Sequence, residues 1–199
     1  MKAFILYLVL LASATSAVRA QGTLVYDQES STDEAYTSGG AFIQAFGTVG
    51  QSFTPSLSTV GFFRVKVYDI YPGNTLGATL VMNLRSGSIS GPILGTTVPV
   101  VLTNGFAGSM NFFLAAPIQV TPATTYYMET VVQSGDSWGA RTLGDVYSGG
   151  VFYGGGGPAT GNDLWFREGI VVPEPTSASF LLIGSMALAF VVRRKPTNR

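Results

Sequence analysis

The sequence of 199 residues contains neither cysteine nor histidine. No disulfide can therefore stabilise the fold, and no thiolate or imidazole can bind zinc, copper or an iron–sulfur cluster. Catalytic pairs of serine or cysteine with histidine are excluded for the same reason. Charged residues are also scarce, at 11% of the chain. Away from the two ends, carboxylates, Lys66 and the tyrosines are the side chains left for acid–base chemistry.

The formal net charge is zero, but the charges are unevenly distributed along the chain. Residues 21–175 contain all eleven acidic residues and five of the basic ones, which gives this part a net charge of −6. A protein that binds nucleic acid needs a basic surface. We therefore predict that nucleic acid is not a partner.

The N-terminal residues have the order of a secretory signal peptide. Lys2 precedes an apolar run over residues 3–12, and small and polar residues then lead to Ala20 and Gln21. A charged, then an apolar, then a small-residue segment is typical of exported proteins. Cleavage between Ala20 and Gln21 satisfies the requirement for a small residue, and cleavage after Ala17 is the alternative. Residues 1–20 are therefore predicted to be a signal peptide that is removed on export.

An uncharged apolar run over residues 176–192 lies between a proline-rich tetrapeptide and a basic cluster. As a helix, at about 1.5 Å per residue, this run would be roughly 26 Å long, close to the ~30 Å hydrocarbon core of a bilayer. An amphipathic or buried helix of a soluble domain is the alternative, but the run is apolar on all faces. We therefore predict one transmembrane helix, followed by a cytoplasmic basic tail over residues 193–199. The stop-transfer residues of this tail are Arg193, Arg194 and Lys195.

The tetrapeptide Val172-Pro173-Glu174-Pro175, the apolar run and the basic cluster together resemble a PEP-CTERM sorting signal. Gram-negative bacteria that make extracellular polysaccharide carry this signal, and a membrane enzyme called exosortase processes it. The resemblance covers residues 172–195, within a sorting region of residues 171–199, and the extra residues 196–199 depart from the usual pattern. It implies an exosortase-type partner, a transient inner-membrane intermediate, and release to the cell surface or the extracellular matrix. The prolines beside Glu174 favour an extended backbone, which suits an exposed cleavage site.

Residues 21–170 form the predicted ectodomain, which is long enough for one domain with its own core. Short segments with period-two alternation are separated by glycine, proline, asparagine and serine, as is typical of strands and turns. We therefore predict an all-β, antiparallel β-sandwich. A jelly roll is favoured over an immunoglobulin-like sandwich, because the region exceeds ~100 residues and has no Cys-Trp-Cys spacing. The clearest strand segments are residues 63–69, 80–85, 110–114, 126–132 and 164–167.

A second resemblance covers about residues 23–170. Three segments are similar to parts of jelly-roll ectodomains in bacterial surface proteins, which in turn resemble galactose-binding-like carbohydrate modules. The resemblance implies a fold rather than an activity. The three segments are Gly50-Gln51-Ser52-Phe53-Thr54, Thr121-Pro122-Ala123-Thr124-Thr125-Tyr126-Tyr127 and Asp163-Leu164-Trp165-Phe166-Arg167.

The segment 134–165 combines aromatic residues with many glycines and several amide and carboxylate side chains. Aromatic faces stack on the C–H patches of sugars, and amide or carboxylate groups bind sugar hydroxyls. A glycan such as exopolysaccharide is therefore a candidate partner. The alternative is that these aromatic side chains pack in the core and the glycines form turns. The candidate glycan-binding residues are Trp138, Tyr147, Tyr153 and Trp165.

The acidic residues allow two further interpretations. Two clusters can supply oxygen ligands to a structural Ca²⁺, although neither has the spacing of an EF-hand loop and a solvated acidic face explains them equally. Glu129 and Glu168 can serve as the carboxylate pair of a glycosidase if they face each other across a cleft. We predict instead a non-enzymatic structural or adhesive protein with no cofactor and no assigned metal site; carbohydrate binding is the alternative. The clusters are Asp27, Glu29, Asp33 and Glu34, and later Asp136, Asp145 and Asp163.

Overall fold

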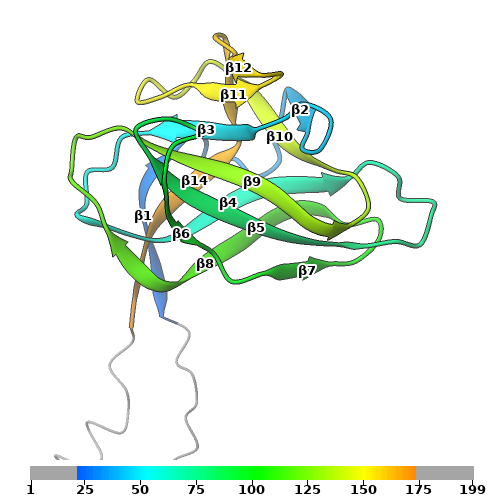
Figure 1. The fold of residues 1–199 in the computed structure, drawn as a ribbon, viewed down its shortest axis with the longest axis horizontal. Coiled ribbons are helices and arrows are strands. Elements are labelled where there is room, and N and C mark those ends of the chain that lie inside the picture. The colour runs from blue at the N-terminus through cyan, green and yellow to red at the C-terminus, as the bar shows by residue number, and fades with distance from the viewer. Residues whose placement is uncertain (1–21, 174–199) are drawn as a thin grey trace, which may run out of the picture. The chain divides into compact units, whose positions relative to one another are not determined.

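A computed structural model describes residues 22–173, of which Leu24–Val171 form one compact unit. The described residues fold into two antiparallel sheets that pack as a sandwich, and no helix occurs among them (Figure 1). The prediction of an all-β antiparallel sandwich is therefore confirmed. The predicted signal peptide and the predicted membrane helix lie outside the described residues.

The first sheet is built around the long strand β4 (Thr59–Asp69). One edge of β4 pairs with β8, while its other edge pairs with β14 and then with β10; Val65, for example, lies opposite Met110 on one side and Phe166 on the other. β1 extends the sheet beyond β14, and β2 and β13 both pair with β10. The bounds are β1 (Thr23–Glu29), β2 (Gly39–Phe42), β8 (Ala107–Gln119), β10 (Trp138–Gly144), β13 (Asn162–Leu164) and β14 (Phe166–Val172).

The second sheet has the order β12-β11-β3-β9-β5-β6, and β7 also pairs with β5. The two sheets are joined at one edge, where Thr97 forms a bridge with Leu114 and the Val98 N–H donates to the Phe113 carbonyl at 2.8 Å. The bounds are β3 (Val49–Phe53), β5 (Ala78–Ser86), β6 (Ile93–Thr96), β7 (Val100–Leu102), β9 (Tyr126–Gly135), β11 (Phe152–Gly154) and β12 (Gly157–Pro158).

The period-two alternation of the sequence positions the core between the sheets. In β4 the side chains of Phe63, Val65 and Val67 are buried in the core, whereas Arg64 and Lys66 lie on the outer face. Leu80, Met82 and Leu84 of β5 occupy the same core from the opposite sheet. Burial of each such side chain stabilises the fold by about 1.5–3 kcal/mol, so this shared interior is the main favourable contribution to the fold.

The predicted strand 164–167 is divided into two strands in the structure. β13 ends at Leu164 and β14 begins at Phe166, because β13 pairs with β10 whereas β14 pairs with β4. Trp165 lies at the change of partner: its N–H donates to the Arg141 carbonyl of β10 at 2.9 Å. The predicted alternation of this segment is confirmed, since the side chains of Leu164 and Phe166 both lie in the core.

Candidate functional site

Trp138 and Trp165 are not glycan-binding residues, which corrects the prediction made from their sequence context. Both side chains have an exposed fraction of 0%. A sugar ring needs an open aromatic face, and neither indole presents one to solvent. The alternative interpretation, that these aromatic side chains pack structurally, is the one that the structure supports.

The indole of Trp165 is covered by the chain itself. Its Nε1–H donates to the backbone carbonyl of Asp33 at 3.0 Å. The Arg167 guanidinium lies 5.2 Å and the Lys66 ammonium 5.7 Å from the ring centroid, within the range of cation–π attraction. Arg167 also donates to the carbonyl of Ser31 at 2.9 Å, which fixes the N-terminal segment over the ring. Trp165 therefore anchors the segment between β1 and β2 to the outer face of the first sheet.

Trp138 and Tyr147 are likewise occupied by packing. The Trp138 ring stacks on Phe106 with 6.4 Å between centroids. The Tyr147 ring meets Phe166 edge-on at 5.1 Å, and its hydroxyl donates to the Gln28 side chain at 3.0 Å. Burial is the main reason why the pKa of Tyr147 is raised above its usual value. The prediction that Tyr147 binds glycan is therefore also wrong, because only 7% of this residue is exposed.

Tyr153 is the one predicted aromatic residue that retains access to solvent. It lies in β11, and its ring meets Tyr127 of β9 edge-on at 5.7 Å. Phe152, its neighbour in the strand, belongs to the core, so Tyr153 and Tyr127 lie on the outer face of the second sheet. The structure does not bring Tyr153 together with Trp138 or Trp165 to form a site.

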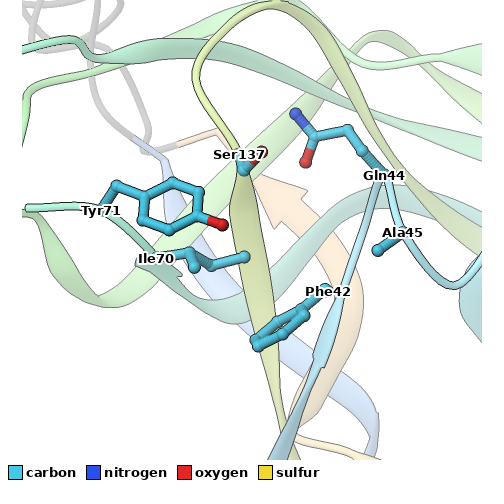
Figure 2. A pocket seen from close by; sticks show the side chains of 6 residues that line it. All are labelled: Phe42, Gln44, Ala45, Ile70, Tyr71 and Ser137. Carbon is cyan, nitrogen blue, oxygen red and sulfur yellow. The ribbon is translucent and has the colours of Figure 1, made fainter.

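A pocket that the sequence did not predict lies where three loops meet at one end of the sandwich. Its volume is about 280 Å³, just below the roughly 300–1,000 Å³ range of ligand sites. Figure 2 shows Tyr71 and Gln44 on either side of Ser137, with Phe42 at the other end and Ile70 between Tyr71 and Phe42. Both aromatic side chains are accessible, with exposed fractions of 41% for Phe42 and 58% for Tyr71.

Hydrogen bonds hold the three loops of this pocket together. The Gln44 amide donates to the Asp136 carbonyl at 2.7 Å and accepts from the Trp138 N–H at 3.0 Å, so that it spans the turn between β9 and β10. The Ile70 N–H donates to the Ser137 carbonyl at 3.2 Å. The Tyr71 N–H donates to the Asp69 carboxylate at 2.8 Å, which fixes the backbone that carries the exposed ring. These hydrogen bonds fix the three loops relative to one another.

A second pocket, of about 270 Å³, lies beside the first. Phe42 lines the first pocket and Phe46 lines the second, and the two rings stack on each other at 5.6 Å and an angle of 5°. The turn that carries them is closed by a hydrogen bond from the Phe46 N–H to the Phe42 carbonyl at 3.0 Å. The Gly155 N–H donates to the Phe46 carbonyl at 2.9 Å, which ties this turn to the loop after β11. Asn162 supplies a polar side chain to the second pocket.

Glu168, one member of the proposed glycosidase pair, points into the sandwich rather than into a cleft. Its exposed fraction is 0%, and neither carboxyl oxygen makes a hydrogen bond of standard geometry among the described residues. Burial, and then the negative charge of Asp27, raise the pKa of Glu168 from 4.5 to about 9. Glu168 is therefore a neutral carboxylic acid at pH 7.

Asp27, the charged neighbour of Glu168, is ionised. Partial burial opposes its ionisation, but hydrogen bonds from the Leu57 N–H at 3.0 Å and from Ser56 outweigh this effect and lower the pKa of Asp27. Glu129, the other proposed glycosidase residue, belongs to the opposite sheet, where it forms a salt bridge of 2.8 Å with Arg85. Glu129 and Glu168 therefore do not form a catalytic pair across a cleft.

Asp163 is a second fully buried carboxylate, and both of its oxygens accept hydrogen bonds. It accepts from the Gln51 amide at 2.8 Å and from the N–H groups of Val146 and Tyr147 at 2.8 and 2.7 Å. Gln51 in turn accepts from the Leu164 N–H at 2.9 Å. Asp163 therefore fixes the loop after β10 to strands of both sheets.

The acidic clusters predicted as calcium ligands are dispersed. Among residues 22–173, no three carboxylates lie close enough together to hold a metal ion. Several acids bind protein groups instead: Glu34 binds Arg64 at 2.7 Å, Glu29 binds Arg167 at 3.2 Å, and Asp33 accepts from the Ala35 N–H at 2.7 Å. These contacts hold the segment between β1 and β2 against the first sheet.

Comparisons with known proteins leave the chain unassigned. No model of a known protein family matches it, and no curated protein resembles it in sequence. Within the described part of the chain, no helix has the length and apolar character needed to cross a membrane.

The residues of the new pocket had weak but readable signals in the sequence. Tyr71 precedes Pro72-Gly73-Asn74, so an aromatic residue begins a run of turn formers. Phe42 and Phe46 are four residues apart, on either side of Gln44, a spacing that by itself fits one face of a strand and so gives only a weak signal. A search for aromatic residues at turns, rather than for tryptophan among glycines, would have found them.

Proposed function

We propose that this chain is an exported surface or extracellular-matrix protein of a Gram-negative bacterium, with a structural or adhesive sandwich of the jelly-roll type. An exosortase-type enzyme sorts it after insertion in the inner membrane. The observation that carries the proposal is the match between the fold and the predicted processing sites. β1 begins at Thr23, directly after the predicted signal cleavage, and β14 ends at Val172, directly before Pro173. Cleavage at both sites would leave the sandwich intact.

The position of the two terminal strands also supports this proposal. β1 and β14 are neighbours in the first sheet, and the start of β1 lies at the same end of the sandwich as the end of β14 (Figure 1). A cut after β14 would leave the strand pairing complete.

A non-enzymatic role is favoured by the lining of the two pockets. Neither lining includes an aspartate, a glutamate or a lysine. Without histidine or cysteine, acid–base or nucleophilic chemistry at the first pocket would have to rely on the hydroxyls of Tyr71 and Ser137, and no carboxylate or lysine in the lining could activate them. The glycosidase alternative lacks the facing carboxylates that it needs, because Glu129 and Glu168 belong to different sheets and only Glu129 pairs with a cation.

The sorting step is tested by replacing both motif prolines. We expect the Pro173→Ala, Pro175→Ala double variant to remain as a full-length species in the membrane fraction of a host with an exosortase. The wild-type chain should yield a shorter, released form. Immunoblots of membrane and medium fractions distinguish the two species. Pro196→Ala, beyond the basic cluster, is the matched control and should be processed normally; equal release of the double variant would contradict the proposal.

A further inference from the structure

We propose that the pocket formed by Phe42, Gln44, Ile70, Tyr71 and Ser137 binds a neutral sugar unit, and that the adjoining pocket at Phe46 contacts a longer glycan. This inference gives the proposed adhesive role a ligand class, and it rests on that role only for its biological setting. The site replaces the one predicted from Trp138 and Trp165, whose rings are buried.

The exposed aromatic rings give the first argument. Phe42, at the end of β2, and Tyr71, in the loop after β4, line one small pocket, and each retains a large accessible area. The pyranose ring of a sugar has apolar C–H patches that stack on such rings. A pocket of about 280 Å³ suits a ligand of roughly this size rather than a protein segment. Ile70 adds an apolar wall between the two aromatic residues.

The polar groups in the pocket match sugar hydroxyls. The Gln44 amide uses one N–H and one oxygen lone pair on backbone groups, so a second N–H and a second lone pair remain. The hydroxyls of Tyr71 and Ser137 can each donate and accept. A sugar hydroxyl also donates and accepts, so it can satisfy both kinds of group. A purely apolar ligand would instead remove these polar groups from water without compensation.

The charge of the pocket and of its surroundings favours neutral over acidic sugars. The lining contains no charged side chain, whereas a cation would give a uronic acid or a sulfated sugar its strongest hydrogen bonds. The domain around the pocket is acidic overall, and a polyanion would be repelled from it. The observations therefore favour a neutral glycan over an acidic polysaccharide.

The pocket is also preorganised. Hydrogen bonds from Gln44, Ile70 and Tyr71 fix the three loops, so binding does not have to order them. The stacked Phe42–Phe46 pair then connects the first pocket to the second, where Asn162 provides another amide. A glycan of several sugar units seated in the first pocket would extend past this ring pair toward the second. We therefore expect affinity to increase with glycan length.

The test uses the full-length chain purified in detergent. The probes are glucose, mannose and galactose oligosaccharides of two to six units, with uronic-acid oligosaccharides of the same lengths for comparison. We expect saturable binding of at least one neutral series in isothermal titration. Tyr71→Ala and Phe42→Ala should each raise the Kd about tenfold or more. Phe46→Ala should weaken the binding of the hexasaccharide but not that of the disaccharide.

Matched controls separate the site from general effects on the fold. Tyr36 is 53% exposed, close to the 58% of Tyr71, and Phe113 is 40% exposed, close to the 41% of Phe42. Tyr36→Ala and Phe113→Ala should leave the Kd unchanged. A wild-type chain that binds none of the neutral series, a preference for uronic acids, or equal Kd values for Tyr71→Ala and Tyr36→Ala would overturn the proposal. Sorting is measured in cells, so its failure would be distinguishable from failure of glycan binding.

Discussion

The surroundings of Trp165 and of Tyr71 show two uses of an aromatic side chain in one domain. At Trp165 the chain itself supplies the partners of the ring, namely the cations of Lys66 and Arg167 and the carbonyl of Asp33. At Tyr71 the ring remains exposed, beside a glutamine with hydrogen-bonding capacity to spare. The comparison teaches that residue type does not assign a ligand site. A candidate ligand site is indicated instead by the exposure of the ring and by neighbouring polar groups with free hydrogen-bonding capacity, and both depend on packing.

The largest effect that would sharpen this comparison is expected from Trp138→Ala. Removal of a fully buried indole leaves a cavity, and such changes lower the free energy of unfolding by about 3–5 kcal/mol. Tyr71→Ala removes an exposed ring and should change the same quantity by less than about 0.5 kcal/mol. Urea denaturation of the two variants measures the difference. Similar losses for both would mean that the two aromatic environments are not distinct.

The next largest effect is expected at the buried carboxylate of Asp163. Asp163→Ala leaves the Gln51 amide and two backbone N–H groups without their acceptor, which should cost roughly 3 kcal/mol of unfolding free energy. Asp145→Ala is the matched control, because Asp145 is exposed in the same loop region and its loss should cost less than about 0.5 kcal/mol. Equal denaturation midpoints for the two variants would contradict the structural role of Asp163.

Glu168 offers a test through pH. Its pKa of about 9 in the folded state exceeds the usual 4.5, so between these values the folded chain holds a proton that the unfolded chain has lost. The contribution of this group is therefore fully present below pH 4.5, and the free energy of unfolding should fall by up to about 1.4 kcal/mol per unit as pH rises toward 9. Glu168→Gln should remove this slope.

Denaturation midpoints measured between pH 5 and pH 9 check the prediction for Glu168. Asp27 acts in a different window, because its lowered pKa gives stability that is lost only as pH falls below its usual 3.8. Glu129→Gln is the control, since Glu129 forms a salt bridge in the opposite sheet and should not reproduce the effect. A wild-type chain whose stability does not decline between pH 5 and pH 9 would show that Glu168 is not a buried neutral acid.

The smallest effect is expected from Trp165→Phe. The substitution keeps an aromatic ring between Lys66 and Arg167. It loses the hydrogen bond to the Asp33 carbonyl and leaves part of the fully buried indole volume empty, which together should cost about 2 kcal/mol. Thermal or urea denaturation measures this loss. Lower protection of the Ala35 N–H in hydrogen exchange would locate it in the segment between β1 and β2. A loss as large as that of Trp138→Ala would mean that the ring does more than anchor this segment.

The sequence predicted the fold class because the alternation of apolar and polar residues identifies a strand from a few neighbouring positions. The alternation of Phe63, Val65 and Val67 with Arg64 and Lys66 is enough to orient β4. The division at Trp165 was missed, since it arises from a change of pairing partner between β10 and β4 that no local pattern records. The order of strands within each sheet was not predicted either, because it depends on pairing between segments far apart in the sequence.

The candidate site was mostly beyond reach of the sequence. Tryptophan among glycines predicts a binding loop, but whether Trp138 is exposed depends on Phe106, which lies far from it in the chain. The pocket at Tyr71 depends on Gln44 spanning the turn at Asp136, a contact across 92 residues. Likewise, the raised pKa of Glu168 comes first from burial and then from the charge of Asp27, which lies far from it in the sequence. Each of these features is a property of packing between distant segments.

The affinity of Tyr71→Ala and Trp165→Phe for the same neutral hexasaccharide separates the exposed pocket from the buried indole in a single assay. Both variants are expected to fold, so a change in Kd reports on the site itself. We expect Trp165→Phe to bind with the wild-type Kd, whereas the Kd of Tyr71→Ala should be about tenfold higher or more. Loss of binding in Trp165→Phe with a wild-type Kd in Tyr71→Ala would contradict this expectation.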